Sequence, residues 1–117
     1  MLQLFAINLY FGRRITFKSI VMQFLLIAFD GKEPGAEDLR ARVRPVHLEK
    51  IAELKRKGEF LFGGAILDDE GRMKGSMIVY ELPDRQSLEE RLKDEPYLYE
   101  GVWQKVEIYP FRLARID

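Results

Sequence analysis

Four segments of the chain carry the apolar patterns of β-strands. Residues 23–29 (QFLLIAF) form a short, nearly continuous apolar run, which is typical of a central strand covered on at least one face. Pro110, in the last segment, indicates that the second half of that strand lies at a sheet edge or bends, because proline cannot donate to a neighbouring strand. The predicted strands are residues 23–29, 59–67, 75–82 and 102–116.

The glycine pair Gly63-Gly64 lies inside the second predicted strand. Paired glycines in a strand mark either a bulge or a place where another group approaches the backbone closely. The pattern favours the bulge. The other interpretation would make Gly64 part of a ligand site.

A long helix is predicted between the first two strands, over residues 37–58. Two acidic residues begin it, a basic run ends it, and Gly58 follows as a left-handed stop, so the charges suit the helix dipole. Pro45 lies inside this segment, lacks a backbone donor and clashes with the preceding turn. We therefore predict a short first turn at residues 37–43 and a main helix over residues 45–57.

A second helix is predicted over residues 84–93, where Leu88 and Leu92 form an apolar pair one turn apart. The order of elements is then strand, helix, strand, strand, helix, strand. This order predicts an α+β fold of the ferredoxin-like (βαββαβ) type, with an antiparallel sheet and both helices on one face. The other face of the sheet stays open and apolar, so we expect a homodimer that buries it.

Composition narrows the function classes. The 117 residues suit one domain, and the formal net charge of zero does not suggest a nucleic-acid or membrane partner. The absence of cysteine excludes disulfides, a cysteine nucleophile and thiolate metal sites, and it fits a cytoplasmic protein. Because the chain has one histidine, a multi-histidine metal site within one subunit is excluded, and we expect no metal.

Residues 1–21 differ from the rest, because they contain basic residues but no acidic ones. Three interpretations remain open: an extension that is not native to the domain or is weakly ordered, an added edge strand, or an export signal. The first is favoured. The export signal is the least favoured, because the apolar run after the paired arginines is needed as a core strand and no small-residue cleavage site follows it. The predicted division is therefore an extension at residues 1–21 and one domain at residues 22–117.

His47 is placed by the helical spacing on the face that should meet the sheet. Arg40 and Arg44 precede it by seven and three residues, so the three share one stripe. An inward imidazole is either a general acid–base group or a buried histidine satisfied by one carboxylate, and the residues alone favour the second. Arg44 suits an anion site and a solvated face equally. Arg40 is expected on a solvated face, paired with Glu37 or Asp38.

A serine and three aromatic side chains are further candidates for a ligand site. Ser76 could donate its hydroxyl to a ligand, although a serine that opens a strand is more often structural. With no second histidine in the chain, a serine-hydrolase site does not follow. Tyr97, Tyr99 and Trp103 could form an aromatic wall of a pocket, although aromatics near a final strand more often belong to the core or to a dimer contact.

Several short motifs stand in an order and spacing that are specific when taken together. They are RPVHL at residues 44–48, Gly58 with Gly63-Gly64, Gly75-Ser76, PY at 96–97, GVW at 101–103 and VEIYPF at 106–111. In these motifs the chain resembles the YCII-related proteins of the dimeric α+β barrel superfamily. The resemblance covers residues 22 to about 111.

The resemblance implies a dimer in which two sheets close into a barrel. It also implies a pocket beside a histidine and an aspartate that are suspected to form an acid–base pair. His47 matches the histidine. Glu95 stands where the family has aspartate, directly before the Pro-Tyr pair, and Asp94 stands one residue earlier, so either carboxylate could be the partner. Relatives in the wider family resemble lyases or dehydrochlorinases that act on hydroxylated aromatic rings without a cofactor, so no cofactor is implied.

Two functions remain in view. The first is a small cofactor-independent lyase or isomerase in which His47 takes a proton, Glu95 or Asp94 orients it and Arg44 holds negative charge. The second is a non-catalytic module that binds a small molecule in the same pocket. In both, we expect the remaining substrate-binding residues to be Ser76, Gly64 and Tyr97.

Overall fold

The computed structural model describes residues 21–116, which form a four-stranded antiparallel sheet and three helices. The predicted extension at residues 1–21 lies outside the described residues except for Val21. No helix within the described part of the chain is long and apolar enough to cross a membrane. The elements are β1 Met22–Asp30, α1 Ala36–Arg56, β2 Phe60–Leu67, β3 Met73–Leu82, α2 Arg85–Lys93, α3 Pro96–Tyr99 and β4 Trp103–Phe111.

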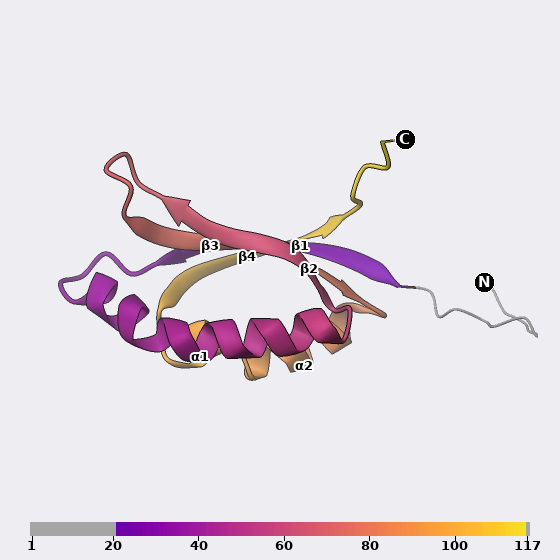
Figure 1. The fold of residues 1–117 in the computed structure, drawn as a ribbon, viewed down its shortest axis with the longest axis horizontal. Coiled ribbons are helices and arrows are strands. Elements are labelled where there is room, and N and C mark those ends of the chain that lie inside the picture. The colour runs from indigo at the N-terminus through magenta and orange to yellow at the C-terminus, as the bar shows by residue number, and fades with distance from the viewer. Residues whose placement is uncertain (1–20, 117) are drawn as a thin grey trace, which may run out of the picture.

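The strands lie in the order β2-β3-β1-β4, and the helices cover one face of the sheet (Figure 1). This is the predicted ferredoxin-like α+β fold, with the apolar strand β1 in the centre. Pro110 lies in the edge strand β4, where its missing donor is tolerated. Strand β4 ends at Phe111 rather than at residue 116, because Phe111 pairs with Gln23 and only Met22 remains before it in β1.

Helix α1 is one continuous helix of 21 residues, so the predicted restart at Pro45 is wrong. Pro45 is exposed, and its missing N–H removes only one intrahelical bond on the side that water can reach. The buried stripe of the helix, which includes Val43 and Leu54, continues on both sides of the proline and holds the two halves in line. Gly58 has a φ of 78°, which confirms the predicted left-handed stop.

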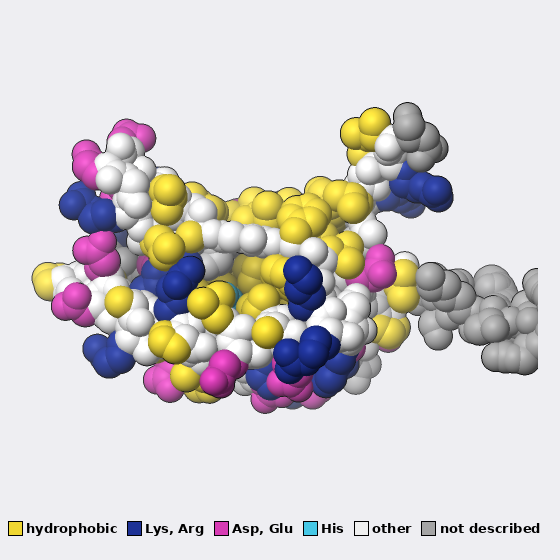
Figure 2. All heavy atoms as spheres, viewed as in Figure 1, with side chains coloured by type: hydrophobic (Ala, Val, Ile, Leu, Met, Phe, Trp, Pro, Cys, Tyr) yellow, Lys and Arg dark blue, Asp and Glu magenta, His cyan; other side chains and the backbone are white. Residues whose placement is uncertain are grey.

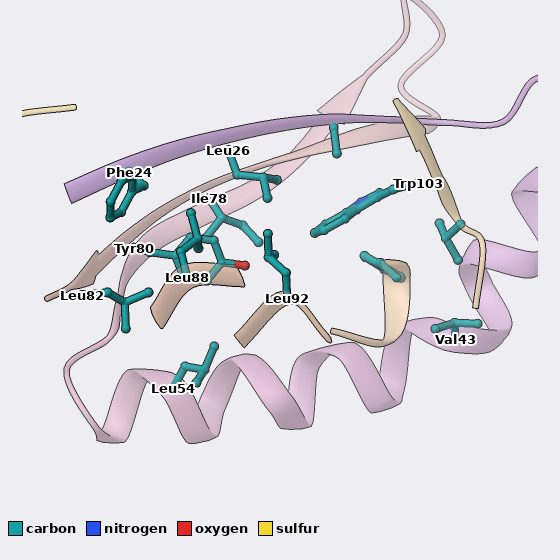
Figure 3. Packing of buried hydrophobic residues seen from close by; sticks show 13 residues of the cluster. Phe24, Leu26, Val43, Leu54, Ile78, Tyr80, Leu82, Leu88, Leu92 and Trp103 are labelled. Carbon is teal, nitrogen blue, oxygen red and sulfur yellow. The ribbon is translucent and has the colours of Figure 1, made fainter. Parts of the chain in front are cut away.

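The core fills the space between the sheet and the helices (Figure 3). Leu88 and Leu92 of α2 point into it, as their spacing predicts, and meet Leu54 from α1 and Ile78 from β3 in the same cluster. Asp84 caps α2, because its side chain accepts a hydrogen bond from the Ser87 backbone N–H at 2.8 Å. This core fixes the short segment between α2 and β4 against α1.

The glycine pair in β2 does not form the predicted bulge. Gly63 and Gly64 pair in register with Ile78 and Met77, and the register shifts fall elsewhere in the strand. A Cβ on Gly63 would lie 2.5 Å from the Met77 backbone oxygen, so close approach of β3 explains this glycine. A Cβ on Gly64 would meet no atom within 4 Å.

The face of the sheet that points away from the helices carries an apolar row across all four strands. Its members pair in register and alternate with the core residues of the same strands. Hydrophobic side chains gather along this side of the molecule (Figure 2). The row, from β2 to β4, is Phe62, Val79, Leu25 and Tyr109.

Candidate functional site

A hollow of about 130 Å³ lies between helix α1 and the strands β2 and β3. Figure 2 shows it beneath the sheet edge, with hydrophobic side chains inside and basic side chains near its rim. Larger hollows, of about 200, 480 and 690 Å³, lie at the ends of the sheet, and His47 lines none of these three. The smaller hollow brings together residues that are far apart in the sequence, including Arg40, Arg44, His47, Gly64, Ser76 and Tyr97.

His47 and Glu95 form a buried pair beside this hollow. His47 Nδ1 lies 2.8 Å from Glu95 Oε2, and the two residues are 8% and 2% exposed. Asp94, the other candidate partner, is exposed and ends helix α2. The contact therefore joins His47 to the carboxylate that stands directly before the Pro-Tyr pair.

Local sequence places Glu95 for this contact. Pro96 stands at the start of α3, where its missing N–H is no loss, and Glu95 is the N-cap residue. Glu95 Oε2 accepts a hydrogen bond from the Tyr97 backbone N–H at 2.8 Å. Because the same oxygen faces His47, the cap fixes the carboxylate that meets the ring.

The hydrogen-bond pattern assigns the tautomer of His47. Glu95 Oε2 acts as an acceptor toward the Tyr97 amide, so we assign the proton to His47 Nδ1, which then donates to Oε2. His47 Nε2 then carries a free lone pair. Glu95 Oε1 is buried and has no hydrogen-bond partner among the described residues.

Two aromatic rings hold the imidazole in place. Tyr97 stacks on His47 with ring centroids 3.9 Å apart and an interplanar angle of 13°. Trp103 meets His47 edge-on at 6.3 Å. Burial raises the pKa of Tyr97, although the charges of Arg40 and Arg44 oppose that rise. The Tyr97 phenol thus keeps its proton at neutral pH and remains a hydrogen-bond donor.

Arg40 is buried, which corrects the expectation that it lies on a solvated face beside Glu37 or Asp38. Its side chain is 5% exposed, and Nη1 lies 2.9 Å from both carboxylate oxygens of Asp30. The guanidinium also lies over the Tyr97 ring, 4.6 Å from the centroid. Burial raises the pKa of Asp30, and the hydrogen bond and charge of Arg40 oppose that rise.

Ser76 joins Arg40 to the aromatic wall. Its hydroxyl oxygen accepts hydrogen bonds from Arg40 Nη2 and from Trp103 Nε1, each at 3.0 Å. The sequence pattern did not identify Asp30 as a site residue. Two features of the sequence could have indicated the contact between Arg40 and Asp30. Arg40 stands on the inward stripe of the helix, and Asp30 stands at the end of a buried strand.

Arg44 and Gly64 lie at the opening of the site. Arg44 is exposed and stands one turn before His47 on α1, so its guanidinium reaches the hollow from solvent. Gly64 leaves space in the opposite wall, since nothing lies within 4 Å of the position of a Cβ. Within residues 21–116, no group of three or more His, Asp or Glu side chains is arranged to hold a metal ion.

Solved structures similar to the chain support the fold. One is the 5-chloro-2-hydroxyhydroquinone dehydrochlorinase from Burkholderia phenoliruptrix, solved in complex with 2,5-dihydroxybenzoquinone. It has 21% identity and a TM-score of 0.68, and the match covers 80% of this chain and 96% of that one. PA3566 from Pseudomonas aeruginosa has 19% identity and a TM-score of 0.51, over 83% and 99% of the two chains.

A third similar structure is a dimeric ferredoxin-like protein from an uncultured marine organism, with 11% identity and a TM-score of 0.51 over 84% and 94% of the two chains. No curated protein compared with the chain matches it. The model of the YCII-related domain matches residues 22–112, which is most of the chain. The protein therefore belongs to the YCII-related domain family.

Proposed function

We propose that the protein is a small-molecule enzyme of the lyase or isomerase class that transfers protons through His47 and needs no cofactor for that step. The observation that carries the proposal is the buried His47–Glu95 contact at 2.8 Å beside a hollow. An imidazole titrates near neutral pH, and a carboxylate on one ring nitrogen fixes the tautomer and stabilises the cation. A residue that served only to lock the helix would not need to line a hollow.

In the proposed reaction, His47 Nε2 takes a proton from a carbon or a hydroxyl group of the substrate. Glu95 accepts the Nδ1–H bond throughout and stabilises the imidazolium that forms. In an elimination, the electron pair released by the proton forms the new double bond and expels the leaving group as an anion. In an isomerisation, His47 returns the proton to another atom of the substrate. After an elimination, the His47 imidazolium releases its proton to bulk water, so in both cases His47 ends as the neutral base.

The size of the hollow limits the part of a substrate that it can hold to about one ring. A cavity of roughly 150 Å³ is large enough for benzene, and the hollow measures about 130 Å³. The similar dehydrochlorinase acts, by its name, on a chlorinated hydroxyhydroquinone. That likeness guides the choice of a first substrate panel, in which Arg44 would hold negative charge, Tyr97 and Ser76 would contact the ring substituents, and Gly64 would admit the ligand.

We further propose that the protein works as a homodimer in which the apolar rows of two sheets pack together. Large side chains in the row remain partly exposed in one chain, with Phe62 at 38% and Tyr109 at 46%. Exposed apolar patches of this kind usually mark an interface.

The proposal is tested with a panel of chlorinated and hydroxylated single-ring compounds, including chlorohydroxyhydroquinones. Product formation by the wild type is compared with His47→Ala and with a control, Asp94→Asn, which removes the exposed neighbouring carboxylate. We expect the wild type and the control to form product and His47→Ala to lose at least about a hundred-fold in rate. Equal turnover by the wild type and His47→Ala would contradict the proposal.

The second candidate function is a non-catalytic module that binds a small molecule. It is favoured by the modest size of the hollow and by its buried polar atoms that lack partners. Binding of panel compounds without turnover, measured by calorimetry with the wild type, would establish this function in place of the enzyme.

A further inference from the structure

Ser76 has an unusual hydrogen-bonding position. Its oxygen accepts from Arg40 Nη2 and from Trp103 Nε1, each at 3.0 Å. A guanidinium and an indole N–H can only donate, so both lone pairs of the hydroxyl oxygen are in use. The Ser76 proton is therefore the one part of the group that remains for a further bond, and Ser76 can act only as a donor toward a ligand.

No described residue accepts that proton. Ser76 is 2% exposed, and its hydroxyl donates to no acceptor in residues 21–116. The nearby carboxylate of Asp30 is engaged, because both of its oxygens accept from Arg40. Ser76 also lines the hollow. A buried hydroxyl without an acceptor is costly, so the hollow is where the acceptor is expected.

Two more donor groups with no partner belong to residues that line the same hollow. The hydroxyl of Tyr97 and Nε of Arg40 are both buried and unpaired among the described residues. Arg40 links the group, since its guanidinium binds Ser76 and lies over the Tyr97 ring. The wall of the hollow formed by these three residues thus presents proton donors, and the Asp30 carboxylate beside Arg40 already accepts a hydrogen bond at each oxygen.

We propose that Ser76, Tyr97 and Arg40 form a subsite for an acceptor oxygen of the ligand, such as a phenolate, an enolate or a carbonyl oxygen. The inference rests on the proposed function in taking the hollow as the ligand site, and it adds how the ligand is oriented and selected. A ligand that brings an N–H donor to this wall finds only the Tyr97 hydroxyl oxygen as an acceptor, so it binds more weakly. An oxyanion on the substrate ring would be stabilised while His47 moves a proton elsewhere on the ring.

The test uses two nearly isosteric rings, pentafluorophenol and pentafluoroaniline. At neutral pH the first is a phenolate with an acceptor oxygen, and the second carries a donor amine in its place. Fluorine NMR titration of the full chain measures both affinities. Hydrogen bonds to a charged group contribute enough that we expect the phenolate to bind about ten- to a hundred-fold more tightly. Equal affinity for the two rings would overturn the subsite.

Variants show whether the phenolate binds through the subsite donors or only through a general attraction to basic residues such as Arg44. Tyr97→Phe removes a hydroxyl that has no partner in the protein, so it should leave stability unchanged and weaken the phenolate about ten-fold or more. Tyr99→Phe, on the same short helix but 58% exposed at Tyr99, is the matched control and should change neither affinity. A Tyr97→Phe variant that binds both rings as the wild type does would also overturn the proposal.

The result of the subsite test can be told apart from the result of the turnover test of the proposed function. A phenolate preference that depends on Tyr97, without any turnover, would retain the subsite and remove the enzyme. Turnover that depends on His47, without a phenolate preference, would retain the enzyme and remove the subsite. Ser76→Thr, which keeps a hydroxyl, should preserve the preference, and its loss in Ser76→Ala alone would assign the effect to the hydroxyl proton.

Discussion

Glu95 meets His47 with the same carboxylate oxygen that caps helix α3. Oε2 lies 2.8 Å from His47 Nδ1 and accepts the Tyr97 backbone N–H at 2.8 Å. The group that orients the imidazole is thus fixed by the turn between α2 and β4, while the imidazole itself is fixed by α1. Any change at Glu95 therefore acts both on the cap and on the ring, and the two effects have to be separated by the choice of substitution.

The substitution Glu95→Gln separates the effect on the cap of α3 from the effect on the His47 ring. The amide oxygen can still accept the Tyr97 N–H, so we expect a loss of unfolding free energy of about 1 kcal/mol. The neutral amide no longer stabilises an imidazolium, so turnover should fall roughly 10²- to 10⁴-fold. Urea denaturation and steady-state kinetics on an active panel compound measure the two effects. Asp94→Asn is the control, and an equal loss of turnover in both variants would contradict the role of Glu95.

The sheet and its helices could be predicted from the sequence because their signals are local. The apolar run of β1, the Leu88–Leu92 pair and Gly58 each need only neighbouring residues to be interpreted. The burial of Arg40 depends on a partner ten residues earlier, Asp30. In the sequence alone, Asp30 before Gly31 is equally typical of a turn. Polar side chains brought together by distant elements leave no periodic pattern, so this part of the site had to come from the structure.

The continuity of α1 shows a second limit. A proline inside a helical pattern predicts a break from local chemistry alone. Here Pro45 is exposed, and tertiary packing of the buried stripe offsets the one lost bond. The position of His47 relative to Arg40 depends on that continuity, because a restart at Pro45 would have rotated one residue relative to the other.

Arg40→Met should destabilise the protein strongly. It leaves the Asp30 carboxylate buried without its cation, and breaking a buried pair costs about 3–5 kcal/mol. The double variant Arg40→Met/Asp30→Asn removes the stranded charge and should recover a large part of that loss. Chemical denaturation of the wild type, the single variant and the double variant measures this. A double variant no more stable than Arg40→Met would contradict the pairing.

The stability of the Arg40→Met variant should depend on pH in a defined direction. Burial already raises the pKa of Asp30 while Arg40 opposes it, so removal of Arg40 raises that pKa further. A carboxyl whose pKa is higher in the folded state binds its proton more tightly when folded. The contribution of this carboxyl to the free energy of unfolding is most favourable below the pKa that it has in the unfolded protein. The contribution is lost as the pH rises through the pKa that it has in the folded protein. Relative to the wild type, Arg40→Met should thus lose less stability in mildly acidic buffer than at neutral pH.

Gly63 and Gly64 should respond differently to alanine. A Cβ on Gly63 would lie 2.5 Å from the Met77 backbone oxygen, which cannot move without disturbing the β2–β3 pairing. Gly63→Ala should cost about 1–3 kcal/mol of unfolding free energy. Gly64→Ala meets open space and should be neutral or slightly stabilising, because alanine lowers the entropy of the unfolded chain. Thermal and urea unfolding of both variants check this, and equal losses would contradict it.

A charge in the apolar row should separate the proposed dimer without unfolding its subunits. Tyr109 is 46% exposed on edge strand β4, so Tyr109→Glu places a carboxylate where two sheets would pack and leaves the core intact. We expect a rise of at least about a hundred-fold in the dimer dissociation constant, measured by sedimentation velocity. Val46→Glu is the control, since Val46 is 50% exposed on helix α1, away from that face. A wild type that sediments as a monomer at micromolar concentration would contradict the proposed dimer, and equal effects of the two variants would place the interface elsewhere.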